Sequence, residues 1–173
     1  MNRMHTLPRP AATSKPDRFL ARSARLALTG PAQLTSPLSR WAVTLLAVAG
    51  AALLAWSGVI HLQLWSDGYR DISVIGPLFL IQGIGGFALA LAVVAFRRAV
   101  LLAAGAVLLA GTAVGLLLSA GIGLFGFQES LAVPYATSSL VVEFTGAAVL
   151  AVATAIVLAG RQRPVQAISG PRP

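Results

Sequence analysis

Four long apolar segments alternate with short polar ones along most of this chain. They cover residues 41–65, 73–96, 100–127 and 137–160. An α-helix rises ~1.5 Å per residue, so each segment is long enough to cross the ~30 Å hydrocarbon core of a bilayer. The connections between the segments are short, which favours antiparallel neighbours. The sequence therefore predicts an all-α membrane protein whose four transmembrane helices form an up-down-up-down bundle.

The segments outside this transmembrane domain are basic. Residues 1–40 contain five prolines that interrupt any long helix, so we expect a disordered cytoplasmic tail there. As an alternative to disorder, residues 19–28 of this tail could form a short amphipathic helix on the membrane surface. The Arg-rich leader also resembles a transit or signal peptide, but the first apolar segment is too long for a signal sequence and favours an uncleaved anchor. Residues 161–173 are expected to form a second, short cytoplasmic tail.

The distribution of charge predicts the orientation. The chain carries 13 Lys and Arg against 5 Asp and Glu, a net charge of +8. All basic residues except Arg70 fall within residues 1–40, at Arg97 and Arg98, or after residue 160. By the positive-inside rule both termini should then be cytoplasmic, with the basic tail attracted to anionic lipid. Nucleic-acid binding is not expected, because interleaved aromatic residues and a recognised binding module are missing.

The chain offers little for catalysis or metal binding. It has no cysteine, which excludes disulfides, thiolate zinc sites, iron–sulfur clusters and thiol nucleophiles. Glycine patterns that resemble dinucleotide-binding motifs begin at Gly83 and Gly121, but both lie inside apolar segments without a βαβ unit. No second histidine lies in a predicted span to complete a bis-His haem. We therefore expect neither enzymatic activity nor a cofactor.

Small residues recur at every fourth position in the third apolar segment. They are Gly111, Gly115, Ser119 and Gly123. Such a stripe on one face of a helix lets a neighbouring backbone approach closely. The pattern predicts helix packing within the bundle, and contact in a homo-oligomer is the alternative.

Three polar residues interrupt the apolar segments at a common depth. His61 lies about one turn from the end of the first segment, and Gln82 and Glu143 lie about two turns into the second and fourth. Ser57 and Ser139 share helical faces with His61 and Glu143. Exposing the Glu143 carboxylate to lipid would cost several kcal/mol, so it should face the bundle interior. There it either locks helices together or handles a proton, an ion or a ligand.

The first loop and its flanks carry a recognisable pattern. Residues 61–72 read HLQLWSDGYRDI, and residues 75–82 read IGPLFLIQ. This H-x-x-L-W, GYR and I-G-x-L-F-L pattern resembles the signature of uncharacterised small four-helix integral membrane proteins of high-GC bacteria. The resemblance implies a bacterial cell (inner) membrane, and one unit formed by the end of the first helix, the loop and the start of the second helix. Ser73 stands where the pattern has proline.

That unit places charged side chains near His61 at a low-dielectric boundary. Arg70 is expected to pair with a carboxylate, and the candidates are Asp67, Asp71, Glu129 and Glu143. Pairing with Glu143 would matter most, because the alternative there is an unpaired buried charge. The candidate ligand- or proton-binding residues are His61, Gln82, Glu143, Arg70, Asp67 and Asp71.

The sequence therefore favours one function class and leaves two others open. The leading hypothesis is a non-enzymatic integral membrane protein with a small outward-facing polar pocket, acting as an accessory or small-ligand-binding subunit. A proton-coupled transport component that uses Glu143 is the alternative, and a haem- or metal-binding membrane protein ranks below both. The accessory role implies a membrane-protein partner or a second copy of the chain.

Overall fold

The computed structural model describes residues 15–132 and 135–160, whose regular secondary structure is helical. The four long helices are α2 Pro37–Ser66, α3 Ile75–Phe96, α4 Ala99–Ile122 and α5 Ala136–Ala159. The shorter ones are α1 Lys15–Ala27 and two 3-10 helices, η1 Pro31–Gln33 and η2 Tyr69–Asp71. Each of the long helices is apolar and long enough to cross a membrane. The prediction of an all-α protein with four transmembrane helices is confirmed.

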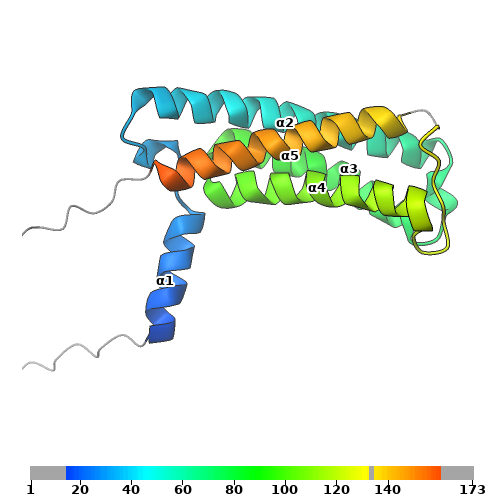
Figure 1. Ribbon diagram of the computed structural model, residues 1–173, viewed down its shortest axis with the longest axis horizontal. Helices are drawn as coiled ribbons and strands as arrows, with labels where there is room; N and C mark the ends of the chain where they lie inside the picture. Colours follow the sequence, from blue (N-terminus) through cyan, green and yellow to red (C-terminus); the bar gives the residue numbers. More distant parts are fainter. Residues whose placement is uncertain (1–14, 133–134, 161–173) are drawn as a thin grey trace, which may run out of the picture.

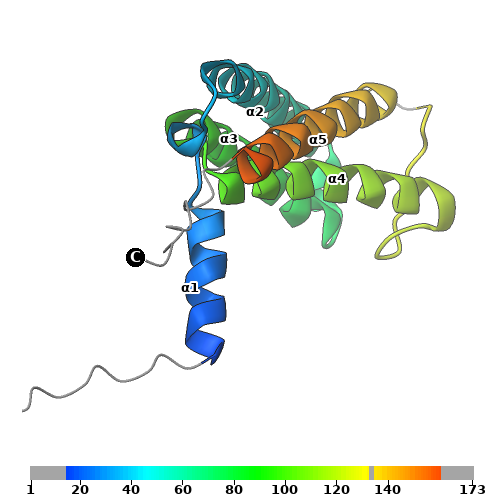
Figure 2. The same cartoon turned by 60° about the vertical axis from the view of Figure 1, so that its left-hand side comes forward.

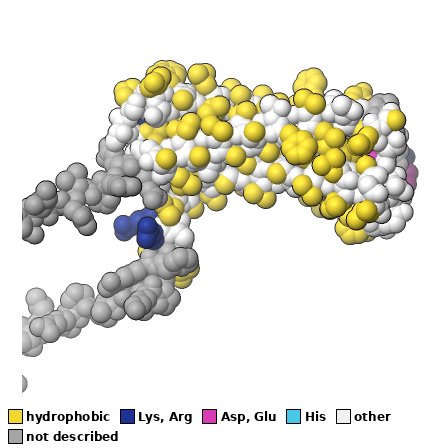
Figure 3. Space-filling view, viewed as in Figure 1, with side chains coloured by type: hydrophobic (Ala, Val, Ile, Leu, Met, Phe, Trp, Pro, Cys, Tyr) yellow, Lys and Arg dark blue, Asp and Glu magenta, His cyan; other side chains and the backbone are white. Residues whose placement is uncertain are grey.

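The four long helices lie side by side in alternating directions (Figure 1). The connections 67–74 and 123–135 lie at one end of the bundle, here named the loop end. The α3–α4 turn, η1 and the last residues of α5 lie at the opposite end, here named the terminal end. Hydrophobic side chains cover the visible side of the bundle between these ends (Figure 3), as a lipid-facing surface requires. The chain is therefore a multi-pass membrane protein.

Glycines bring the backbones of α2 and α3 together. A Cβ atom on Gly86 would lie 3.0 Å from the carbonyl oxygen of Leu54, and one on Gly58 would lie 3.0 Å from that of Gly83. Larger side chains at these positions would push the helices apart. Leu54 and Leu150 are fully buried in the resulting core. Gly83 and Gly86 of the motif-like pattern in α3 thus serve helix packing.

The predicted packing stripe on α4 does not pack against another helix. No other atom lies within 4 Å of a Cβ built on Gly111 or Gly115. Ser119 is buried, and its carbonyl oxygen accepts backbone hydrogen bonds from Gly123 and Glu129. The cause is the spacing of the helices, because α3 and α4 touch far less than α2 and α3 or α4 and α5 do. Small residues permit a close approach, but they do not enforce it.

The third transmembrane helix also ends earlier than expected. The apolar segment 100–127 predicts a helix to residue 127, whereas α4 ends at Ile122. Gly123 follows with φ +79°, a left-handed conformation that glycine adopts readily. Leu124 and Phe127 then exchange backbone hydrogen bonds of 2.7 and 2.9 Å across a tight turn. Hydropathy missed this turn because apolar side chains fill it.

The expected disorder of residues 1–40 is not met in the described part of that segment. Helix α1 occupies residues 15–27 and runs across the bundle axis rather than along it (Figures 1 and 2). Its end is tied to the bundle, since the backbone N–H of Ala99 donates to the Thr29 carbonyl at 2.8 Å. Leu34 is fully buried, and the Arg40 guanidinium donates to its carbonyl oxygen. Residues 1–14 and 161–173, which contain the rest of the predicted tails, lie outside the described residues.

Candidate functional site

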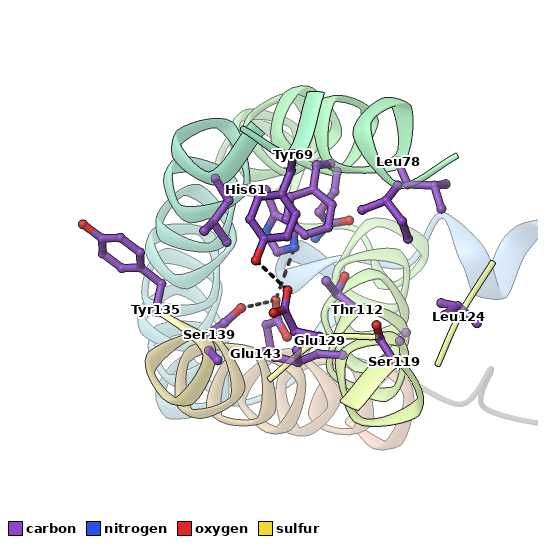
Figure 4. A pocket seen from close by; sticks show the side chains of 18 of the residues that line it. His61, Tyr69, Leu78, Thr112, Ser119, Leu124, Glu129, Tyr135, Ser139 and Glu143 are labelled. Carbon is purple, nitrogen blue, oxygen red and sulfur yellow. Dashed lines mark hydrogen bonds and ion pairs between the residues drawn. The ribbon is translucent and has the colours of Figure 1, made fainter. Parts of the chain in front are cut away.

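A cavity of about 480 Å³ opens within the loop-end half of the bundle. Its walls come from all four transmembrane helices and from both loop-end connections. Most of the wall is apolar, and its larger members are Leu64, Leu78, Phe79, Val107, Leu108 and Leu116. The volume falls within the ~300–1,000 Å³ of small-molecule sites. Figure 4 shows His61, Ser139 and Glu143 turned toward the interior of this cavity.

A polar cluster joins α2 and α5 at the cavity. The Glu143 side chain is fully buried, and its Oε1 accepts hydrogen bonds from the hydroxyls of Ser139 at 2.8 Å and Ser57 at 3.3 Å. His61 Nε2 lies 3.9 Å from the same oxygen. Ser57 and His61 are four residues apart on α2, and Ser139 and Glu143 are four apart on α5, so each pair shares one helical face. The predicted common depth of His61 and Glu143 thus becomes a direct contact.

The backbone sets the orientation of the His61 ring. Its Nδ1 lies 2.8 Å from the Ser57 carbonyl oxygen. A carbonyl can only accept, so Nδ1 carries a proton and donates it. The other nitrogen, Nε2, is left facing Glu143, and the Phe79 ring packs against the imidazole with centroids 5.0 Å apart. The neutral ring therefore presents a lone pair to the carboxyl group, and the protonated ring presents a donor.

Two buried polar atoms of the cavity residues have no hydrogen-bond partner among the described residues. They are Gln82 Nε2, a donor, and Glu143 Oε2. Both side chains line the cavity, and both residues are more than nine-tenths buried. Buried polar groups in native proteins are nearly always paired, with protein, water or ligand. The predicted candidates Gln82 and Glu143 therefore lie together at one cavity, each with an unused polar atom.

Aromatic rings from three segments cover the loop end of the cavity. Tyr69 stacks on Phe79 with centroids 5.0 Å apart, and it meets the edge of Phe127 at 5.7 Å. The Tyr69 hydroxyl donates to Glu129 Oε2 at 2.7 Å, which ties η2 to the second loop. Burial, the hydrogen bond to Glu129 and the charge of Glu129 raise the pKa of Tyr69 above its usual value. This cover joins the two loop-end connections.

The other predicted site residues do not line the cavity. Arg70 Nε lies 3.5 Å from Asp71 Oδ2, and the two side chains are 59% and 83% exposed. The only hydrogen bond to the Asp67 side chain among the described residues comes from the neighbouring Ser66 hydroxyl at 3.3 Å. The hypothesis that Arg70 neutralises Glu143 is wrong in this structure, because Arg70 faces solvent beside Asp71. An exposed pair of that kind contributes only ~0–1 kcal/mol.

Two residues of the cover were not predicted as part of the site. Tyr69 was an unassigned member of the GYR pattern, and Glu129 entered only as a candidate partner of Arg70. Glu129 is the one carboxylate of the second loop. Its presence, together with a tyrosine in the first loop, was the sequence feature that could have suggested this contact. Pairing between loops distant in sequence depends on the fold, and a single sequence does not show it.

Within the described residues, no three His, Asp or Glu side chains gather closely enough to hold a metal ion. No family model matches the chain, and neither curated proteins nor solved structures give a match. The class of protein defined by the fold and the cavity is a four-helix membrane bundle with a buried, mainly apolar pocket.

The contact between Tyr69 and Glu129 predicts how stability depends on alkaline pH. The folded state holds the Tyr69 proton to a higher pH than the unfolded state does, so this stabilisation is full below the unfolded-state pKa. We expect the free energy of unfolding to fall as pH rises past about 10, the ordinary tyrosine value. Tyr69→Phe should lower the free energy of unfolding by about 1 kcal/mol at neutral pH. In this variant the free energy of unfolding should also fall less at alkaline pH.

Thermal unfolding in detergent, followed by circular dichroism across this pH range, measures the effect. Tyr135→Phe is the matched control, because the Tyr135 hydroxyl accepts only an exposed hydrogen bond from Gln63. The control should retain the alkaline fall of the wild type. An identical pH profile for Tyr69→Phe and the wild type would contradict the assigned role of the Tyr69 hydroxyl.

Proposed function

We propose that the protein is a non-enzymatic membrane protein that binds a small ligand in the loop-end cavity, as an accessory or ligand-binding subunit. The observation that carries the proposal is that Gln82 and Glu143, which line a mainly apolar pocket, each have a buried polar atom, Nε2 and Oε2, without a partner among the described residues. An unsatisfied buried polar group costs ~1–3 kcal/mol. A ligand with an apolar body and one polar group would remove that cost and fill the pocket.

Native mass spectrometry tests this proposal. The full chain is extracted from its own membranes in mild detergent, and small molecules that remain bound are released and identified. We expect a bound molecule on the wild type, loss of that molecule in Gly111→Phe, and its retention in Gly121→Phe. Gly111 lines the cavity whereas Gly121 does not, and neither would place a Cβ near another atom. Equal occupancy in both variants, or no bound molecule in any protein, would refute a ligand-binding role for the cavity.

We further propose the bacterial inner membrane as the location, with the terminal end in the cytoplasm. In support, α1, Arg97 and Arg98 lie at the terminal end, and acidic side chains lie at the loop end (Figures 1 and 3). By the positive-inside rule this arrangement supports an outside location for the loops at the loop end. The cavity then opens in the outer half of the bilayer.

Single-cysteine labelling checks the orientation. The chain has no cysteine, and Ser66 and Ser130 are exposed at the loop end. An impermeant maleimide added to intact cells should label Ser66→Cys and Ser130→Cys, and it should label Ser23→Cys on α1 only after the cells are opened. The reverse pattern would overturn the orientation.

Helix α1 supports a surface contact with anionic lipid at the same membrane face. Its sequence contains Lys15, Arg18, Arg22 and Arg25. Because α1 crosses the bundle axis at the terminal end, it lies parallel to the membrane plane when the bundle spans the bilayer (Figure 2). Basic residues near an anionic surface contribute ~1 kcal/mol each. An accessory subunit acts together with another membrane protein or with a second copy of its own chain. Crosslinking in the membrane before detergent extraction would identify that partner.

A second candidate, a proton-coupled transport component, rests on one observation. His61 Nε2 and Glu143 Oε1 lie 3.9 Å apart inside the membrane-spanning region, and paired ionisable groups at such depth mark proton pathways in transporters. Proteoliposomes with an entrapped pH-sensitive dye test it. Under this hypothesis an imposed pH gradient decays faster with the wild type than with Glu143→Gln. If the pH gradient decays at the same rate with the wild type and with Glu143→Gln, proton transport through Glu143 is excluded. The ligand-binding proposal would be unaffected.

A further inference from the structure

The lining of the cavity reaches the lipid-facing surface of the bundle at α3 and α4. These two helices touch far less than the neighbouring pairs α2–α3 and α4–α5. Leu78 on α3 and Val107 on α4 both line the cavity, yet they are 44% and 72% exposed. Gly111 and Gly115 line the cavity on α4, and space remains where their side chains would be. In a bilayer, the surroundings of this surface are acyl chains.

The polar end of the cavity restricts the head group of a ligand. Gln82 Nε2 requires an acceptor, and Glu143 Oε2 requires a donor when ionised or an acceptor when protonated. A hydroxyl group serves both atoms in either state of Glu143, since it has one proton to donate and two lone pairs. An ammonium group leaves Gln82 unpaired, and a carboxylate group repels an ionised Glu143. The two atoms therefore favour a neutral group that both donates and accepts, and a hydroxyl is the smallest such group.

We infer that the ligand is a neutral, hydroxyl-bearing amphiphile that enters from the bilayer through an opening between α3 and α4, with its hydroxyl at Gln82 and Glu143 and its apolar chain along Gly111 and Gly115. This inference rests on the proposed ligand-binding function. It explains why Gly111 and Gly115 of α4 face a cavity, because a larger side chain at either position would narrow the space for the apolar chain of the ligand. It also explains why apolar walls surround a buried carboxyl group.

The matched variants are Gly115→Leu and Gly121→Leu. Both positions are on α4 with no atom within 4 Å of an added Cβ, but only Gly115 lines the cavity. A third variant, Gln82→Leu, removes the donor by replacing the amide side chain with an apolar one. Unfolding temperatures of all variants are measured first, so that a loss of binding is separated from a loss of fold.

The probe is hexadecanol carrying a photoreactive diazirine in its chain, added to the full-length protein in phosphatidylcholine nanodiscs. We expect saturable crosslinking to residues of α3 and α4 at the opening. Gly115→Leu should lower the crosslink yield about tenfold, equivalent to ~1.4 kcal/mol of binding free energy. Gln82→Leu should lower it several-fold, and Gly121→Leu should match the wild type. Unlabelled hexadecanol should compete better than hexadecylamine or palmitic acid.

The outcomes separate this inference from the proposal on which it rests. Preferential competition by hexadecylamine or palmitic acid would overturn the hydroxyl assignment while ligand binding itself stands. Equal crosslinking in Gly115→Leu and Gly121→Leu would overturn access between α3 and α4. Failure of every amphiphile to bind, together with a bound polar molecule in native mass spectrometry, would overturn the inference and keep the proposed function. Failure in both experiments would overturn both.

Discussion

Among valine substitutions at the glycines of α3, Gly76→Val should lower the unfolding temperature of the protein most. A Cβ atom at Gly76 would collide with the Arg70 carbonyl group and would lie 2.8 Å from the Tyr69 carbonyl oxygen. These contacts are backbone atoms, so no rotamer change relieves them. The first turn of α3 and η2 would have to separate, and Tyr69 would leave its place over the cavity.

We expect this substitution to cost about 3 kcal/mol, the upper part of the range for overpacked sites. Gly85→Val is the matched control, because Gly85 lies on the same helix with no atom within 4 Å of an added Cβ. Both variants carry the same β-branched side chain. Thermal unfolding in detergent compares them. Equal unfolding temperatures would show that η2 is not packed on α3 as described.

The second large effect is expected for Glu143→Lys. Glu143 is fully buried beside His61, and its Oε1 accepts two hydroxyl hydrogen bonds. An ammonium group cannot accept these two bonds, and it puts a cation beside His61 in place of the carboxyl group of the cluster. Uncompensated charge at this depth costs about 3 kcal/mol or more.

Glu143→Gln is the control for this prediction. The amide keeps the shape of the side chain and an oxygen for Ser57 and Ser139, so its cost should stay near the ~0.6 kcal/mol average of hydrogen bonds within membrane proteins. Expression level, monodispersity and unfolding temperature are measured for both variants. Similar values for the lysine and glutamine variants would show that residue 143 is open to water, contrary to the structure.

The four transmembrane helices could be predicted because hydropathy acts locally and over long segments. Twenty apolar residues have few alternatives to a spanning helix, since the bilayer satisfies no backbone hydrogen bond. The shared depth of His61, Gln82 and Glu143 followed from the same helical rise. Ser57 and Ser139 could be matched to His61 and Glu143 by their four-residue spacing. These inferences required no knowledge of how the helices pack.

The rest depended on contacts between segments. Gly111 and Gly115 lie in an apolar helix as the glycines at 58, 83 and 86 do, but only the second group lies close to the backbone of another helix. Glu143 was one of four carboxylates considered as a partner of Arg70, whereas the fold turns Arg70 toward Asp71 and solvent. The buried residues between α1 and α2, including Leu34, lie among the five prolines that suggested disorder. In each case, tertiary packing decided between local alternatives.

The most direct test of the account is an experimental structure of the protein purified from its own membranes without added ligand. We expect elongated density inside the cavity, passing between α3 and α4 along Gly111 and Gly115. Its polar end should lie within hydrogen-bonding distance of Gln82 Nε2 and Glu143 Oε2. A bundle in which α3 packs directly on Gly111 and Gly115, with Gln82 and Glu143 bonded to each other and no cavity between them, would contradict it.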